Sequence, residues 1–439
     1  MQVPGGVRAR ADLPVRAPLG QTGGVAGAGL QPSSVVGNDD ERRDKGARPP
    51  AADVKPPRSP IPAPPPSRIS SSVPPARSST PGTMIPPPRP SSSGAVVVAD
   101  IENAIRGATN VVAQCLRPEP TERVHLLTYR AGALARLIER AVADANVPLV
   151  RVPLDAFDKD ESVDTFKTAI TPMLLGATAV IFLAPVRPPQ TLSLAVATTA
   201  ESLGARLLYL LQVDDKLLGQ SVRAAPDLLA TVNERMVRAL AAPSTVHVTS
   251  ESGTDLEIQL SLHHPLLFSS GRPARGASEN LPAGYVYTHP ARVNGVVVVD
   301  RAIFGPKGDV DRAALRRAPV KVRLQSNKVA EHDATDPVVK ARIDQYLESH
   351  ANAGRVGLVV FPTNYLARSE IGSDRQDMLL PGVNLSLGFA DQAHTKAPYE
   401  AAVQLVLLGR KQTIEVDGRK LIDAGRLEQR LVEGIDPFR

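Results

Sequence analysis

The stretch Ala179-Val180-Ile181-Phe182-Leu183-Ala184 is apolar at every position. A strand with one face in water alternates apolar and polar residues, so an unbroken apolar run indicates burial on both faces. Parallel sheets that are covered by helices on both sides bury their strands in this way. The stretch therefore predicts a strand inside a helix-covered parallel sheet.

The segments on either side of this strand alternate between strand and helix patterns. Helices are expected where apolar residues recur at three- and four-residue spacing, and several of these segments end at a Gly or Pro. The further predicted strands are 124–129, 149–154 and 206–213, and the predicted helices are 101–116, 132–146, 162–175, 191–203 and 226–242. This alternation is typical of a three-layer α/β domain with a mostly parallel sheet, which we place at residues 96–243. The first strand ends in Tyr129-Arg130-Ala131-Gly132, which is not a glycine-rich phosphate loop, so a dinucleotide site is disfavoured.

The pattern changes after Pro243. Residues 245–250 and 255–261 alternate apolar and polar side chains around Ser252-Gly253-Thr254, which predicts a hairpin. Further strands are predicted at 295–300, 320–324, 356–361, 383–387, 402–408 and 413–416, and a helix at 337–351. Residues 244–439 therefore predict a β-rich α+β domain, and the chain as a whole is of the α/β class.

Residues 1–95 have a different composition. They contain 20 of the 41 prolines, many serines, and no Phe, Tyr or Trp. A segment of this kind cannot bury enough apolar surface to offset the loss of chain entropy, so we predict a disordered tail.

Charge and cysteine content exclude several classes of function. The tail has 12 Lys and Arg against 6 Asp and Glu, a net charge of +6 that equals the net charge of the whole chain, so the rest is neutral. A nucleic-acid footprint on the folded part is therefore not expected. The single Cys115 excludes an intramolecular disulfide and a cysteine-rich metal site. With neither an 18-residue apolar run nor a secretory signal, we expect a cytoplasmic protein without a membrane partner.

Several segments, in a fixed order, resemble one known family. They are Ser252-Gly253-Thr254-Asp255-Leu256, Asn280-Leu281-Pro282-Ala283-Gly284-Tyr285-Val286-Tyr287-Thr288, Val356-Gly357 with Pro362-Thr363-Asn364, Asn384-Leu385-Ser386-Leu387-Gly388, and Val416-Asp417-Gly418-Arg419-Lys420-Leu421-Ile422 with Gly425. Together with the α/β half, this order is similar to that of the thermophilic aminopeptidases, a family of two-metal exopeptidases. The resemblance covers roughly residues 96–425.

The resemblance implies a metal site whose ligands are missing here. Members of the family bind two divalent metals through two glutamates, a histidine and a His-x-Asp pair, which hold the ions close together and activate water. The corresponding segments of this chain are Gly284-Tyr285, Gly357-Leu358, Asn384 and Gln404-Leu405-Val406. We therefore interpret the chain as a degenerate member, and no metal or other cofactor is expected.

The first functional hypothesis is a metal-free peptide-binding protein, a pseudoenzyme on an aminopeptidase frame. Tyrosine offers a ring face and a hydroxyl, asparagine brackets a peptide backbone, and arginine or lysine binds a carboxylate. The candidate residues are Asn280, Tyr285, Tyr287, His289, Asn384, Arg368, Arg375 and Lys396. Ordinary strand packing of the two tyrosines, and solvated loop positions for the basic residues, stay open as alternatives.

A narrower resemblance suggests a partner. The chain looks like the metal-free peptide-binding proteins of crocagin-type ribosomal peptide biosynthesis, which implies binding of a precursor peptide and its presentation to a separate modifying enzyme. Because the aminopeptidase relatives are dimers, the resemblance also implies a homodimer, or a heterodimer with a paralogue.

The second hypothesis is an enzyme with rebuilt metal ligands. It would be a divergent aminopeptidase, or a relative of the iron-dependent dihydroxypyridine dioxygenases, which the same resemblance includes. It requires His289, His394, Asp391 and Glu400 to converge. The plainer expectation is that His289 packs or forms a hydrogen bond, and that His332-Asp333 is solvated at the end of a strand.

Overall fold

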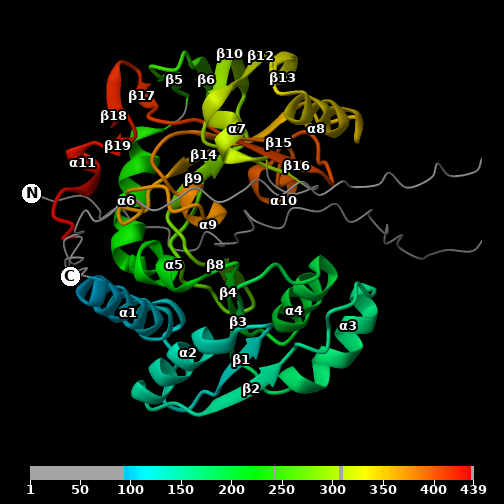
Figure 1. Cartoon of the computed structure of the whole chain (residues 1–439), viewed down its shortest axis with the longest axis vertical. Coiled ribbons are helices and arrows are strands. Elements are labelled where there is room, and N and C mark those ends of the chain that lie inside the picture. Colours follow the sequence, from blue (N-terminus) through cyan, green and yellow to red (C-terminus); the bar gives the residue numbers. More distant parts are fainter. Residues whose placement is uncertain (1–92, 242, 306–309, 437–439) are drawn as a thin grey trace, which may run out of the picture. The chain divides into compact units, whose positions relative to one another are not determined.

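The computed structural model describes residues 93–241, 243–305 and 310–436 (Figure 1). The predicted disordered tail lies outside these residues up to position 92, and its last three positions belong to the first helix. The elements up to residue 243 are α1 (Ser93–Asn110), the π-helix η1 (Val111–Leu116), β1 (Val124–Thr128), α2 (Gly132–Asp144), β2 (Leu149–Pro153), α3 (Val163–Ile170), the 3-10 helix η2 (Thr171–Leu174), β3 (Ala179–Ala184), α4 (Gln190–Ser202), β4 (Arg206–Leu211), α5 (Asp215–Gly219), the 3-10 helix η3 (Ser221–Arg223) and α6 (Pro226–Ala239). The strands and helices predicted for this half are thus confirmed.

These strands form a parallel sheet with the order β2-β1-β3-β4-β8. Successive side chains of a strand point to opposite faces, and here both faces are buried. Ile181 belongs to the core that contains Ile138 of α2, whereas Phe182 belongs to the core that contains Phe166 of α3. Helices α2 and α3 accordingly lie on opposite sides of the sheet (Figure 1). This double burial is the physical reason for the unbroken apolar run in β3.

The remaining elements are mostly strands. They are β5 (Thr245–Thr249), β6 (Asp255–Gln259), β7 (Leu267–Ser269), β8 (Ser278–Asn280), β9 (Tyr285–Thr288), β10 (Arg292–Val299), β11 (Ala302–Phe304), α7 (Arg312–Arg317), β12 (Val320–Gln325), β13 (Lys328–Asp333), α8 (Pro337–Glu348), β14 (Val356–Pro362), α9 (Asp374–Asp377), β15 (Asn384–Gly388), α10 (Gln392–Thr395), β16 (Gln404–Leu408), β17 (Thr413–Val416), β18 (Arg419–Asp423), β19 (Arg426–Leu427) and α11 (Gln429–Val432). The predicted hairpin is β5–β6, with antiparallel pairing from Thr245↔Gln259 to Thr249↔Asp255.

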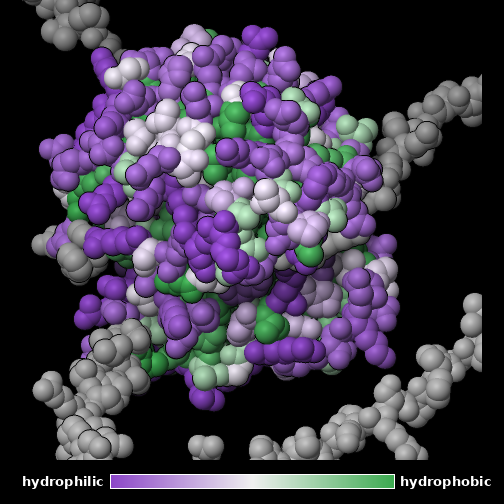
Figure 2. Space-filling model, turned by 45° about the horizontal axis from the view of Figure 1, so that its top comes forward, coloured by the Kyte–Doolittle hydropathy of each residue, from purple (hydrophilic) through white to green (hydrophobic). Residues whose placement is uncertain are grey.

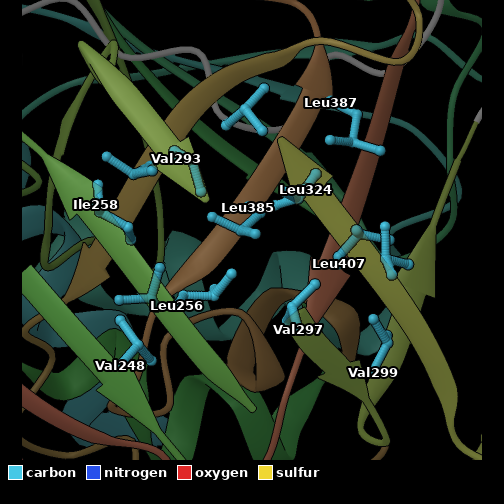
Figure 3. Packing of buried hydrophobic residues seen from close by; sticks show 14 of the residues in the cluster. Val248, Leu256, Ile258, Val293, Val297, Val299, Leu324, Leu385, Leu387 and Leu407 are labelled. Carbon is cyan, nitrogen blue, oxygen red and sulfur yellow. The ribbon is translucent and has the colours of Figure 1, made fainter. Parts of the chain in front are cut away.

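Two sheets of this half pack face to face. One has the order β13-β12-β10-β6-β5-β17-β18-β19, and the other has the order β11-β16-β15-β14-β9-β7. Figure 3 shows side chains of β6 and β10, such as Leu256 and Val297, pointing toward Leu385 of β15 and Leu407 of β16. All four are at most 1% exposed. Burial of a leucine side chain contributes roughly 2 kcal/mol, so this shared layer is the main stabilising contact of the β-rich half.

Strand β8 links the two halves. It lies beyond residue 243 in the sequence, yet it pairs in parallel with β4, with Asn280 opposite Tyr209. The chain then leaves the sheet through Leu281-Pro282 and enters β9 of the six-stranded sheet. A boundary at residue 243 remains a prediction, and all of the described residues belong to one compact unit.

Some local expectations were wrong. Strands β7, β8 and β9 were not predicted, because their few residues do not show clear alternation. His332 lies within β13 and its ring contacts Asp344 at 2.8 Å, so it is not a solvated residue beyond a strand end. Within the described ranges, no helix is long and apolar enough to cross a membrane.

Candidate functional site

Three of the four segments that resemble metal-ligand positions contribute residues to one small cavity, namely Tyr285, Asn384 and Val406. It has a volume of about 30 Å³ and lies where the chain leaves β8, between β9, β14, β15, β16 and α9. Its lining residues are Asn280, Leu281, Pro282, Tyr285, Val360, Arg375, Met378, Leu379, Asn384, Ser386 and Val406. Because β8 runs parallel to β4, the cavity adjoins the carboxyl edge of the parallel sheet, where α/β folds usually bind ligands.

The entry into β9 is fixed by Gly284 and Asn364. Gly284 has φ +104°, and an added Cβ would lie 2.8 Å from the Leu229 side chain and 3.0 Å from Asn364. Asn364 is fully buried and its amide donates to the carbonyl oxygens of Ala283 at 2.7 Å and Ser221 at 3.0 Å. Only glycine tolerates this backbone conformation at such close contact. These two residues therefore position Tyr285 in the cavity wall.

Tyr285 lines the cavity and has a buried hydroxyl without a satisfied hydrogen bond. The residue is 4% exposed, and among the described residues its hydroxyl has no hydrogen-bond partner of ordinary geometry, although Ser269 lies near it. Its ring lies 6.0 Å from that of Tyr287. Burial raises the pKa of the Tyr285 hydroxyl, so it keeps its proton and is available as a donor.

A buried acid that was not predicted shares the neighbour Ser269 with Tyr285. Glu279 is 0% exposed, and its Oε2 accepts a hydrogen bond from the Ser269 hydroxyl at 2.5 Å. Its Oε1 has no partner in the described part of the chain. Burial raises the pKa of Glu279 to about 8, and the bond from Ser269 opposes this shift, so the acid is largely neutral at pH 7. The polar tripeptide Ser278-Glu279-Asn280 gave no sign of a buried strand.

Arg375 supplies the positive charge of the cavity. It is partly buried on α9 and forms no hydrogen bond or ion pair with any described residue. Burial is the main factor that lowers the pKa of Arg375, the charge of Arg187 lowers it further, and the charge of Asp374 opposes the shift. Its neighbours on α9 are already paired, because Arg312 contacts Asp374 at 2.5 Å and also contacts Asp377.

Amide and hydroxyl groups are found where the resemblance implies imidazole ligands. The amide of Asn384 donates to the carbonyl oxygen of Met378 at 2.7 Å. The amide of Gln404 donates to the Ser386 hydroxyl at 2.8 Å, so the Ser386 proton is available to another acceptor. At the second glutamate position Leu358 is fully buried. Divalent metals at such sites require carboxylates and imidazoles, so these residues do not fit the two-metal site that the resemblance implies.

The described residues as a whole contain no group of three or more His, Cys, Asp or Glu side chains arranged to hold a metal ion. Of the four residues of the enzyme hypothesis, only His394 and Asp391 have side chains in direct contact. His394 contacts Asp391 at 2.6 Å, and Glu400 accepts hydrogen bonds from the backbone N–H groups of Ala390 and Gln392. They therefore do not rebuild a metal centre.

The other candidate residues are not part of the cavity lining. The buried Tyr287 donates to Asp391 at 3.1 Å, and Lys396 donates to the carbonyl of Ala393 at 2.9 Å. Arg368 lines a different cavity, of about 440 Å³. Of the eight predicted residues, the cavity brings together Asn280, Tyr285, Asn384 and Arg375.

His289 is also outside the cavity lining. It is 3% exposed, with its Nδ1 2.7 Å from the carbonyl oxygen of Gly357. Its ring packs against His264 with a centroid distance of 4.7 Å. Burial lowers the pKa of His289, so the ring is neutral near pH 7. The expectation that this histidine packs and forms a hydrogen bond is confirmed.

Comparison with known proteins supports the general form of this fold. Wild-type AmpT from Thermus thermophilus, a thermophilic aminopeptidase, matches with a TM-score of 0.53 and 15% identity, covering 74% of this chain and 99% of AmpT. The fold is aminopeptidase-like. No curated protein matches the sequence.

A second group of matches concerns ring-cleaving enzymes. The model of the NicX family, described as 2,5-dihydroxypyridine 5,6-dioxygenase, matches residues 129–326. The solved 2,5-dihydroxypyridine dioxygenase from Pseudomonas putida KT2440 matches with a TM-score of 0.49 and 15% identity, covering 77% of this chain and 99% of that one.

Proposed function

We propose that this chain is a peptide-binding protein that does not hydrolyse peptides through bound metals. The observation that supports the proposal is the composition of the cavity. Three of the four segments that resemble metal-binding positions of an aminopeptidase line it through Tyr285, Asn384 and Val406, which are not metal ligands.

The groups that remain are suited to binding. Asn280 and Asn384 carry both donor and acceptor atoms, and Tyr285 and Ser386 carry hydroxyl protons. A cavity of about 30 Å³ holds one or two water-sized groups and no whole residue. The bound peptide would therefore lie along the surface and insert a single functional group.

Our narrower proposal is that the ligand is a ribosomal precursor peptide, which the protein presents to a separate modifying enzyme. This role requires the protein to bind the peptide without hydrolysing it, and a site without metal ligands is suited to that. We also propose a dimer, by analogy with aminopeptidases.

The test is peptide binding in the presence of a chelator. Full-length protein is dialysed against EDTA and equilibrated with pools of N-acetylated tetrapeptides, and the retained peptides are identified by mass spectrometry. We expect retention of intact peptides that is unchanged when zinc, manganese or iron is restored. Absence of retention, or metal-dependent cleavage of the peptides, would refute the proposal.

A dioxygenase is the second candidate function, favoured by the family match over residues 129–326. It requires iron ligands that the described residues do not bring together. Consumption of oxygen with 2,5-dihydroxypyridine after loading with Fe²⁺ would support this candidate, and its absence would leave the binding function.

A further inference from the structure

The strongest unexplained feature of the cavity is its charge. Arg375 is the one charged residue among its lining residues. A second guanidinium, that of the exposed Arg187 in the loop after β3, is outside the lining, and its charge lowers the pKa of Arg375. Neither arginine has an ion pair with a described residue. Two nearby unpaired cations attract an anion, and a carboxylate matches the planar guanidinium group best.

The acids close to Arg375 do not supply this anion. Asp374 and Asp377 are held by Arg312, with 2.5 Å between Arg312 and Asp374. Glu279 is fully buried beside Ser269 and largely neutral at pH 7. The cavity therefore keeps a net positive charge and has room for an external anion.

Unsatisfied donors point to the same ligand chemistry. Tyr285 lines the cavity, and its buried hydroxyl, near Ser269, has no partner of ordinary geometry in the described ranges. The Ser386 hydroxyl accepts from Gln404 and retains its own proton. Buried polar groups normally have partners, so an unpaired hydroxyl in a cavity wall indicates a missing acceptor. A carboxylate has two oxygens and can accept from Arg375 and from a hydroxyl together.

The size of the cavity limits how the ligand enters. About 30 Å³ holds a group on the order of a carboxylate, but not a complete side chain with its backbone. Asn280 and Pro282, at the carboxyl edge of the parallel sheet, form part of the wall. The carboxylate must therefore lie at the end of a chain, with the rest of the ligand outside.

We propose that the cavity between β8, β9, β15 and α9 binds a carboxylate group of the peptide ligand, either its C-terminal carboxylate or that of an Asp or Glu side chain. The inference rests on the proposed peptide-binding function and names its recognition element. Arg375 binds the carboxylate, Arg187 adds attraction from the surface, and Tyr285 and Ser386 donate to its oxygens. An aminopeptidase acts at the amino end of a peptide, so this site would bind a different part of the ligand, its carboxylate.

The first test compares matched peptide pools on full-length protein. Three pools of N-acetylated tetrapeptides are used: neutral peptides with a free C-terminal carboxylate, the same peptides as C-terminal amides, and amides that contain one Glu. We expect a free carboxylate to increase affinity at least tenfold over the neutral amide, because hydrogen bonds to charged groups are the stronger ones. Preference for the first pool assigns the site to a C-terminus, and preference for the Glu pool assigns it to a side chain. Equal retention of all three pools would overturn the inference.

Variants then locate the effect. Arg375→Gln should remove the preference for the acid, Arg375→Lys should keep part of it, and Arg187→Gln should reduce it about two- to threefold. Arg368→Gln, in the separate cavity of about 440 Å³, is the matched control and should behave as the unsubstituted protein. Melting temperatures confirm that each variant is folded. A preference that survives in folded Arg375→Gln, or that is lost in Arg368→Gln, would overturn the assignment.

A small compound separates this inference from the proposed function. N-acetylglycine carries the carboxylate of a peptide end, and N-acetylglycine amide lacks it. We expect the acid to raise the melting temperature of the unsubstituted protein and not of Arg375→Gln, and the amide to affect neither. If the acid raises the melting temperature in this way while no peptide is retained, the carboxylate site is supported and the proposed peptide-binding function is refuted. If peptides are retained without regard to their carboxylates and the acid has no effect, peptide binding stands and the carboxylate site fails.

Discussion

Glu279→Gln tests the buried acid beside Ser269. The carboxyl group is 0% exposed, and burial raises its pKa from 4.5 to about 8. Below pH 4.5 the group is protonated in both the folded and the unfolded chain, so its full contribution to stability is present. Between pH 4.5 and 8 the unfolded chain loses the proton and the folded chain keeps it, so the free energy of unfolding falls as pH rises. The glutamine variant has no proton to lose and lacks this decline.

The size of the effect follows from the pKa shift. One unit corresponds to about 1.4 kcal/mol, so Glu279 lowers the free energy of unfolding by about 3 kcal/mol at pH 7 and by about 5 kcal/mol above pH 8, relative to pH 4.5. Near pH 4.5 the variant should be equal to the unsubstituted protein or about 1–2 kcal/mol less stable, because its amide adds a buried donor. The variant should therefore become the more stable protein as pH rises.

Urea unfolding at pH 4.5, 7 and 9 measures this difference. The difference between the two proteins is the readout, because buried histidines such as His289 change the stability of both proteins equally. Glu348→Gln is the control, since Glu348 is exposed on α8, and it should follow the unsubstituted protein at every pH. A difference between Glu279→Gln and the unsubstituted protein that stays constant from pH 4.5 to 9 would refute the raised pKa.

Three further substitutions test the framework by urea unfolding at pH 7. Phe182→Ala should lower the free energy of unfolding by about 3–5 kcal/mol, because it leaves a cavity at a fully buried position of β3. A decrease below about 1 kcal/mol would contradict the two-sided burial of the sheet. Arg312→Leu should cost about 3–5 kcal/mol, because it leaves the buried carboxylate of Asp377 unpaired, and a neutral effect would show that this pair does not hold α9. Gly284→Ala should lower the free energy of unfolding by at least about 2 kcal/mol, because its Cβ would lie 2.8 Å from a neighbouring side chain. Its control is Gly418→Ala, where φ is also positive but no atom lies near, and the decrease there should be only about 1 kcal/mol. Equal decreases would contradict the close contact at Gly284.

The sequence predicts the parallel sheet well because the signal is local. A strand buried on both faces must be apolar at consecutive positions, and Ile181 and Phe182 enter two different cores. Helix spacing and glycine stops are equally local, and the helices of the first half were correctly predicted. The predicted hairpin β5–β6 has the same origin, since its two strands are joined by a short turn.

The cavity is less predictable because its contacts are remote in sequence. Strand β8 consists of Ser278-Glu279-Asn280, which has the composition of a loop and becomes a strand because the edge of β4 offers it backbone partners. Arg187 and Arg375 come from different halves of the chain, so no spacing pattern brings them together. Single residues of the site could be proposed from the family resemblance, but Glu279 could not, because nothing in its neighbourhood distinguishes it from a surface acid.

Metal content tests the central claim most directly. Full-length protein is exposed to zinc, manganese and iron, desalted and measured by elemental mass spectrometry. Tyr285, Leu358, Asn384 and Gln404 stand where the resemblance implies metal ligands, and a chain with these residues should retain less than about a tenth of an equivalent of any of these metals. Retention of one or two equivalents would contradict the account, because it would mean that the chain builds a metal centre from residues that the cavity does not contain.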